Sequence, residues 1–193
     1  MVLPIVLYGD AVLRKKASEI LQWNSELKIL IDNMFETMYQ AKGVGLAAPQ
    51  IGKSLRVFVI DARPFAEDEP ENSEAYRQLV DFKKVFINAQ CTELSGELWN
   101  FNEGCLSIPK IREDVQRPSQ IRMQYRDEHW NLHEDTFSGI QARIIQHEYD
   151  HIEGTLFTDR ISPFKRKLLE GKLKAISKGI VNADYKLKRP RKS

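Results

Sequence analysis

The first regular pattern of apolar positions lies between residues 24 and 42. Asn24 or Ser25 can cap a helix there, because their side chains accept hydrogen bonds from backbone N–H groups that lack helical partners. The apolar positions recur at helical spacing and are more typical of core packing than of a ligand surface: Leu27, Leu30, Ile31, Met34 and Met38. We expect this helix to end at Lys42-Gly43, where glycine can adopt the left-handed conformation.

Two more amphipathic helices are predicted near the C-terminus. Ser138 followed by Gln141 forms a capping-box pattern, and Gly154 can end the helix that begins there. The last helix covers residues 163–178 and has Pro163 at the favoured first position. Lysines occupy one of its sides, and apolar residues occupy the other: Phe164, Leu168, Leu173 and Ile176.

The stretch between the first two helices favours β-strands. The expected strands are residues 56–60, 84–91, 93–99, 117–126 and 131–137, of which the last two resemble an antiparallel pair. Residues 61–80 hold six acidic residues and two prolines, which predicts an exposed loop or insertion with a short helix around Glu74 to Leu79. Because no regular βαβ alternation is present, we expect an α+β fold: antiparallel or mixed sheets packed around a central helix, with a C-terminal helix.

The composition is that of an ordinary globular protein. The 193 residues are 42% hydrophobic and 29% charged, and no apolar run approaches the roughly 20 residues that span a bilayer. The N-terminal residues show neither a basic region nor a signal-peptide cleavage site. We therefore expect a cytoplasmic protein without membrane contact, with a single catalytic domain over residues 1–180 and a basic flexible tail over residues 181–193.

The charge is distributed unevenly along the chain. Residues 161–193 hold 11 Lys and Arg against 2 Asp and Glu, although the whole chain has a net charge of only +2. A basic C-terminal region on an acidic body is typical of contact with a polyanion such as ribosomal RNA. A solvated helix followed by a frayed end explains the same pattern, so both interpretations stay open. No specific DNA partner is expected.

The segment QHEYDH at 146–151 contains the pattern H-E-x-x-H. On a helix, His147 and His151 lie one above the other and can bind one metal ion. Glu148 is placed to reach a metal-bound water without ligating the metal. The pattern therefore predicts hydrolysis by a metal-activated water, but a catalytic site of this kind needs a third protein ligand that the motif does not supply.

Several residues are candidates for the third ligand. They are Cys91, Cys105, His129, His133 and several carboxylates. No histidine follows the motif, and the nearest acids after it are too close in sequence to close the site easily. Cys105, in EGCLSIP, would complete a His-His-Cys site if it stood on a strand edge beside the helix. Cys91 is better interpreted as a small buried hydrophobic residue, and a disulfide between the two cysteines is not expected in this compartment.

The segment GVGLAAPQIG at 43–52 has almost no side-chain bulk. Its glycines and alanines let another backbone or a ligand approach closely. It is not a phosphate-binding loop, because no Lys-Ser/Thr follows and Pro49 disfavours a helix start. Gln50 places a polar amide at the end of this apolar run, which a plain glycine turn does not explain.

The three segments GVGLAAPQIG, EGCLSIP and QHEYDH, in this order and at these separations, closely resemble the signature motifs of peptide deformylase. The resemblance covers roughly residues 1–160, although the acidic segment at 61–80 is longer than in the compact members. Enzymes of this family remove the formyl group from the N-terminal methionine of newly made bacterial and organellar proteins. The resemblance therefore implies formyl-methionyl nascent peptides as substrates. Ribosome contact through the basic C-terminal region is an expectation from the charge distribution alone, beside the solvated-helix interpretation.

The resemblance also implies the roles of the metal-site residues. Cys105, His147 and His151 would hold one divalent metal ion, in this family typically Fe(II), with Zn, Ni or Co able to occupy the same site. Hydroxide formed at the metal attacks the formyl carbon, and Glu148 acts as general base. The Gln50 side-chain amide and the backbone N–H of Leu106 then stabilise the oxyanion.

The same resemblance implies how the peptide binds. The substrate would lie extended against the backbone of Val44, Gly45 and Gly104. Its methionine side chain would enter an apolar pocket whose walls are Val44, Ile140, Ile144 and the His147 ring. Glu103 and Arg112 are expected to pair beneath the site.

Two alternatives remain at this stage. An H-E-x-x-H metallopeptidase would cut internal amide bonds, and it would take a Glu or His after the motif as its third ligand. A non-enzymatic, ribosome-associated metal-binding homologue would have a closed four-ligand site and no need for Glu148.

Overall fold

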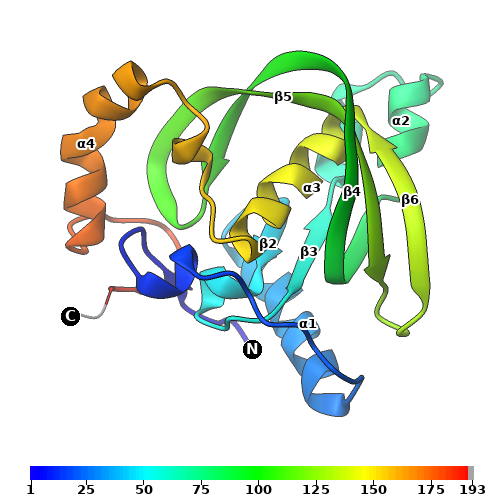
Figure 1. The fold of residues 1–193 in the computed structure, drawn as a ribbon, viewed down its shortest axis with the longest axis horizontal. Helices are drawn as coiled ribbons and strands as arrows, with labels where there is room; N and C mark the ends of the chain where they lie inside the picture. The colour runs from blue at the N-terminus through cyan, green and yellow to red at the C-terminus, as the bar shows by residue number, and fades with distance from the viewer. Residues whose placement is uncertain (191–193) are drawn as a thin grey trace.

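A five-stranded antiparallel sheet wraps around one helix, α3 (Figure 1). The computed structural model describes residues 1–190. The strands of the sheet, in spatial order, are β2 (Gly45–Ala47), β3 (Val57–Asp61), β4 (Lys83–Cys105), β5 (Ile108–Arg126) and β6 (Leu132–Ser138). The α-helices are α1 (Ser25–Gln40), α2 (Glu74–Leu79), α3 (Gly139–Ile152) and α4 (Pro163–Ser177). Short 3₁₀ helices cover Ala11–Arg14, Ala48–Ile51, Arg63–Asp68 and Phe157–Asp159. The chain has the α+β fold that the sequence predicts.

The two long strands β4 and β5 arch over α3 (Figure 1). Their pairing has three register shifts between Ile87 and Leu98, and such irregularities let a long strand bend. The concave side of the sheet packs on α3 through a cluster that includes Phe58, Phe86 and Ile145, each of them fully buried. The helix that carries the H-E-x-x-H pattern is thus held inside the sheet. Among the described residues, no helix is both long and apolar enough to cross a membrane.

Helix α1 follows its predicted pattern except at its C-terminal end. The Asn24 side chain accepts a hydrogen bond from the Leu27 N–H at 2.8 Å, as expected for a cap. The prediction that Gly43 adopts the left-handed conformation is wrong, because Lys42 does so, with φ of 55°. Gly43 instead lies so close to Leu106 that an added Cβ would come within 2.9 Å of the Leu106 side chain.

Two details of α3 and α4 differ from expectation. Ser138 makes no side-chain cap hydrogen bond, so the capping box is wrong; the Gln141 side chain instead donates to the Gln78 backbone oxygen. In α4, Leu173 and Ile176 are buried as predicted, but Phe164 and Leu168 are 71% and 68% exposed. The buried positions are those that face a cluster formed by strand β5 and residues 156–161, and the first half of α4 extends beyond that cluster.

The C-terminal segment is not a free tail in the described residues. Leu187–Lys188 forms a strand, β7, which pairs in parallel with β1 (Ile5–Val6). The N–H of Ile5 donates to the Lys186 oxygen at 2.9 Å. The expectation of a flexible tail from residue 181 is therefore wrong for this segment, because the backbone groups of β1 find their partners there. The part of the expected tail at residues 191–193 lies outside the described residues.

Residues 61–80 contain the short helix that was predicted within the acidic segment. Helix α2 is capped by Ser73, whose hydroxyl accepts a hydrogen bond from the Tyr76 N–H at 3.0 Å. Phe65, in the preceding 3₁₀ helix, turns inward and stacks edge-on against Phe101 of β4. The acidic segment is thus attached to the main core by several of its apolar residues, among them Phe65, Tyr76 and the buried Leu79.

Candidate metal centre and substrate cavity

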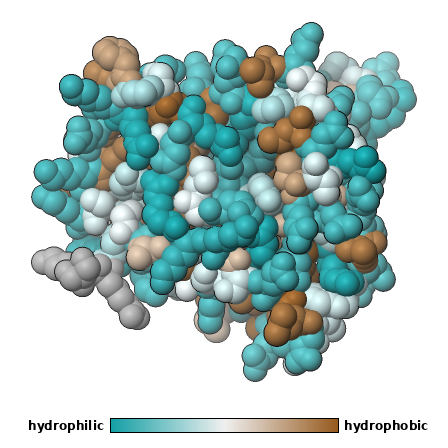
Figure 2. Space-filling view, in the orientation of Figure 1, coloured by the Kyte–Doolittle hydropathy of each residue, from teal (hydrophilic) through white to brown (hydrophobic). Residues whose placement is uncertain are grey.

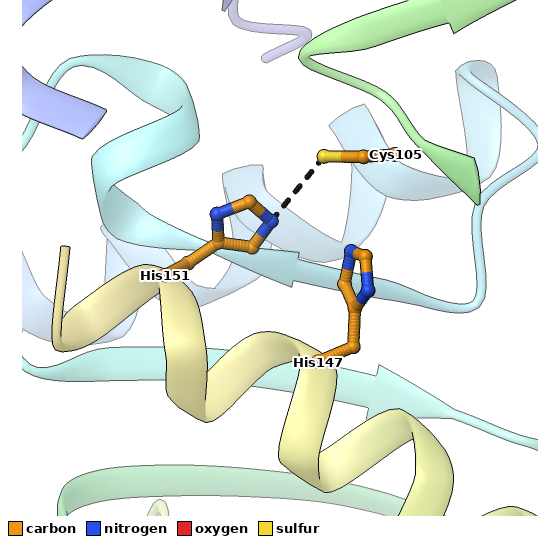
Figure 3. A group of neighbouring side chains, drawn as sticks. All are labelled: Cys105, His147 and His151. Atoms are coloured by element: carbon orange, nitrogen blue, oxygen red, sulfur yellow. Dashed lines mark hydrogen bonds between the residues drawn. The ribbon is translucent and has the colours of Figure 1, made fainter. Parts of the chain in front are cut away.

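Three side chains from two elements meet at one point (Figure 3). Helix α3 presents both imidazoles, and Cys105 ends strand β4 above them. The sulfur and one ring nitrogen of each histidine lie within 4.8 Å of one another, and Cys105 Sγ is 3.3 Å from His151 Nε2. Because residues i and i+4 share a helix face, His147 and His151 are placed by local geometry alone, whereas Cys105 is placed by the sheet.

The donor set fits one divalent metal ion. Tetrahedral coordination by a thiolate and an imidazole puts their ligand atoms roughly 3.5 Å apart, close to the observed separation. His147 Nδ1 is engaged with Glu103 Oε2 at 2.9 Å, which leaves its Nε2 for a metal. The other candidates for the third ligand lie elsewhere: the Cys91 thiol contacts the Glu93 oxygen, and His133 contacts Asp127. Cys91 is half-buried, not fully buried as expected.

Glu103 lies behind the metal ligands in a buried charge network. Its carboxylate accepts hydrogen bonds from Arg117 at 2.7 and 2.9 Å and from Arg143 at 2.9 Å, in addition to the His147 contact. Burial alone would raise the pKa of Glu103, but the hydrogen bonds from Arg117 and His147 hold that pKa well below its ordinary value. A carboxylate that is ionised in this way fixes the orientation of the His147 ring.

The expected pairing of Glu103 with Arg112 is wrong. Side chains alternate between the two faces of a strand, so Glu103 points toward α3 while its neighbours Asn102 and Gly104 face the other way. Arg112 lies opposite Gly104 and donates to the Asn102 side chain at 2.8 Å. Arg117 takes the place that was assigned to Arg112, and it also donates to Asp150 of α3 at 2.7 Å.

Replacing Glu103 with alanine is expected to destabilise the protein strongly. Two arginines that are almost fully buried would lose the carboxylate that both contact, although Arg117 keeps its pair with Asp150. Breaking a buried ion pair costs about 3–5 kcal/mol. Urea unfolding of Glu103→Ala measures this loss. Arg112→Ala is the matched control, and its free energy of unfolding should change by less than about 1 kcal/mol, because its contacts are exposed. Equal losses in the two variants would contradict the network described here.

Glu148 is buried beside the metal ligands and packed against Gly45. A Cβ added at Gly45 would lie 2.4 Å from the Glu148 carboxylate, so only glycine leaves room for it. One carboxylate oxygen, Oε2, has no hydrogen-bond partner among the described residues. Burial raises the pKa of Glu148 to about 7. A carboxyl group with such a pKa can both accept and return a proton near neutral pH.

Gln50 turns its amide NH₂ toward the metal ligands. The Ala47 N–H donates to Gln50 Oε1 at 2.7 Å, which leaves Nε2 to donate toward Cys105 Sγ at 3.6 Å. Leu106 follows Cys105 directly, in the two-residue turn that joins β4 to β5. The amide of Gln50 and the chain at Leu106 therefore lie on the same side of the site as the thiol.

A cavity of about 570 Å³ opens beside these residues. Its walls include the expected substrate-contact and catalytic residues: Val44, Gly45, Gln50, Gly104, Leu106, Ile144, His147 and Glu148. Ile140, which was expected in the methionine pocket, is not part of the wall and packs against the main core instead. Sequence reasoning missed Phe65, Phe101, Arg143 and residues 182–185, which also line the cavity. The one local indication that Phe65 would turn inward was its apolar aromatic side chain within an acidic segment.

Comparison with known proteins gives one family throughout. The family profile described as polypeptide deformylase matches residues 2–167. The peptide deformylase from Christiangramia forsetii is 54% identical to this chain, and the match covers 98% of this chain and 97% of that protein. The one from Flavobacterium johnsoniae is 51% identical, and the match covers 97% of this chain and 96% of that protein. The solved peptide deformylase from Legionella pneumophila has a TM-score of 0.75 at 36% identity, covering 90% of this chain and 94% of that one. The solved peptide deformylase from Thermotoga maritima has a TM-score of 0.72 at 37% identity, and the match covers 84% of this chain and 99% of that one.

Proposed function

Because the chain belongs to the peptide deformylase family, we propose that Glu148, Gln50 and Leu106 carry out the deformylase reaction beside an ion held by Cys105, His147 and His151. The enzyme removes the N-formyl group from the N-terminal formyl-methionine of newly synthesised proteins and releases formate. The observation that carries the proposed roles is the meeting of Glu148, Gln50 and the three ligands at one cavity. A third ligand that precedes the motif does not favour the metallopeptidase alternative.

Glu148 is the proton carrier in this proposal. When bound, the divalent ion would act as a Lewis acid and lower the pKa of a coordinated water. Glu148 would take a proton from the attacking water and later give it to the leaving amine nitrogen. A new C–O bond forms at the formyl carbon and the C–N bond breaks, which yields formate and a free amino terminus. Glu148 packs against Gly45, and its Oε2 has no hydrogen-bond partner among the described residues; both observations support this role.

Gln50 and the backbone N–H of Leu106 stabilise the negative charge on the formyl oxygen in this proposal. Gln50→Ala should lower kcat on a formyl-Met peptide on the order of 10²–10³-fold, because it removes one oxyanion donor. Metal content should stay unchanged. Gln146→Ala is the matched control, since Gln146 is also a buried amide but donates to the Pro118 oxygen outside the cavity. An unchanged kcat in Gln50→Ala would remove Gln50 from the oxyanion site.

The edge of the sheet supports an extended substrate. Strand β2 pairs with β3 on one side only, so its other edge offers backbone groups to a peptide that adds as a further strand. Val44, Gly45 and Gly104 contribute main-chain contacts there, and Val44 and Ile144 form the apolar wall for the methionine side chain. Formyl-peptides with norleucine and with aspartate in place of methionine test the wall: norleucine should keep kcat/KM within about tenfold, whereas equal activity on aspartate would contradict an apolar pocket.

We also propose Fe(II) as the ion used in the cell. One thiolate and two imidazoles suit Fe(II), Zn, Ni and Co, so the ligands alone do not separate these metals. Protein purified without oxygen should contain iron and be active in a formate-release assay, and exposure to air should lower that activity because the thiolate-bound Fe(II) centre is oxidised. Anaerobic protein that contains zinc and no iron would contradict this proposal.

The basic side of α4 is proposed to contact the ribosome. Lys167, Lys174 and the C-cap residue Lys178 share one side of the helix, are exposed and have no ion-pair partner among the described residues. Figure 2 shows mostly hydrophilic residues over this part of the surface. The triple variant Lys167→Glu/Lys174→Glu/Lys178→Glu should weaken salt-sensitive ribosome binding, and its salt dependence should become shallower. Activity on short formyl-peptides should be retained. Cosedimentation at several salt concentrations measures this, and unchanged binding would support a merely solvated helix.

Residues 1–180 are proposed to act, together with the C-terminal segment that pairs with β1 and lines the cavity, as one catalytic domain in the cytoplasm. The metal ligands lie between residues 105 and 151, and buried clusters connect them to both ends of this range. Limited proteolysis of the native enzyme should therefore yield no smaller fragment that keeps deformylase activity. An active fragment that lacks α1 would contradict the single domain.

A further inference from the structure

The turn that follows the metal-ligating cysteine is held by both ends of the chain. Cys105 pairs with Ile108, so Leu106 and Ser107 form the tight connection between β4 and β5. The Ser107 oxygen accepts a hydrogen bond from the Tyr8 N–H at 2.8 Å. The Leu106 oxygen accepts one from the Tyr185 hydroxyl at 2.7 Å. Both carbonyl groups of the turn are thus fixed by residues that are remote in sequence.

The parallel pair of β1 and β7 anchors these two donors. Tyr8 follows β1 by two residues, and Tyr185 precedes β7 by two residues. Tyr185 and Leu106 both pack against the buried cluster that contains Ile5. The β1–β7 pair and this buried cluster therefore fix the position of the Tyr185 hydroxyl that donates to Leu106.

The placement of Tyr185 bears on the direction of the Leu106 N–H. The N–H and the carbonyl of Leu106 belong to successive peptide planes that share one Cα. The preceding plane is held by the β4–β5 pairing of Cys105 with Ile108, and the following plane is held by Tyr185. With both planes fixed, the N–H has one direction. Preorganised donors of this kind stabilise a developing oxyanion without reorganisation during the reaction.

We propose that Tyr185 is a positioning residue of the deformylase reaction, which orients the Leu106 N–H by holding the Leu106 carbonyl. The inference rests on the proposed role of Leu106 as an oxyanion donor. It assigns to the C-terminal segment a part in catalysis that is separate from any ribosome contact. Residues 182–185 also form one wall of the cavity, so a purely steric role for Tyr185 is the alternative that an experiment has to separate.

The substitution Tyr185→Phe removes the hydroxyl and keeps the ring. In the full-length, metal-loaded enzyme, kcat on a formyl-Met peptide should fall about tenfold, less than the loss of a complete oxyanion donor. KM should stay within about twofold, because the interaction is made in the transition state. The matched control is Tyr125→Phe, which removes a tyrosine hydroxyl that donates to Asp135 at 2.8 Å, away from the cavity. Its kcat should not change.

Two outcomes overturn the inference. If kcat of Tyr185→Phe is unchanged, or if only KM rises, Tyr185 is no more than part of the cavity wall. The parallel measurement on Gln50→Ala separates this failure from a failure of the proposed function: a normal kcat in Gln50→Ala would disprove the oxyanion assignment itself. If Tyr185→Phe is less stable, hydrogen exchange at the Leu106 and Ser107 amides of the folded zinc form still tests the hydrogen bond. Exchange must be faster than in the unmodified enzyme, and equal exchange contradicts the proposal.

Discussion

Glu148→Ala should lose nearly all deformylase activity while it keeps its metal. The three ligands do not include Glu148, so removing its carboxylate leaves the donor set intact. General acid–base catalysis typically contributes about 10²–10⁴-fold to the rate, and kcat should fall by at least that range. Formate release from a formyl-Met peptide measures the rate, and elemental analysis measures the metal.

The stability of this variant provides an internal check. Glu148 is buried with one oxygen lacking a partner among the described residues, so its loss should leave the free energy of unfolding unchanged or slightly higher. The control is Glu153→Ala, at the C-cap of α3, where the carboxylate pairs with Arg56 and Lys16 outside the site. That variant should keep its kcat. Substantial residual activity in Glu148→Ala would exclude it as the base.

Cys105→Ala should lose both the metal and the activity. The two histidines that remain would hold an ion far more weakly, and even the loss of a residue behind the ligands typically costs 10–100-fold in metal affinity. Dialysis against a chelator followed by elemental analysis gives the metal content of each variant. A fall in affinity well beyond 100-fold is expected for Cys105→Ala, because a direct ligand is removed.

Cys91→Ala is the matched control for the thiol assignment. Cys91 is half-buried and contacts the Glu93 oxygen, far along β4 from the ligands. Its replacement should leave metal content and kcat unchanged. Loss of metal in Cys91→Ala together with retention in Cys105→Ala would show that the wrong thiol had been assigned.

The local parts of the site were accessible from the sequence because they depend on short-range geometry. His147 and His151 share a helix face by their spacing, and the cap of α1 at Asn24 depends on a residue three positions away. The resemblance of three short motifs then indicated Cys105 and Gln50, which the structure brings to the same cavity. The family membership that the motifs suggested is shown by the relatives.

The wrong predictions concern contacts that strand register or the extent of the protein body decides. Glu103 was paired with Arg112, but neighbouring positions on a strand point to opposite faces, and register places Arg117 on the inner face instead. Leu168 in α4 was expected to be buried, although amphipathic spacing cannot tell how far a helix extends beyond the body of the protein. Both outcomes depend on residues that are distant in sequence.

By itself the sequence determined the fold class, the helix that carries the two histidines, and the family whose chemistry fits them. Periodicity, capping residues and motif order record interactions within a few residues, so they can be recognised without coordinates. Only the tertiary structure decided that Arg117 and Arg143 support the metal ligands, that Phe65 reaches the cavity, and that the C-terminal segment holds the turn at Leu106. These contacts form when the curved sheet closes around α3 and brings the two chain ends together, a long-range outcome that no local pattern encodes.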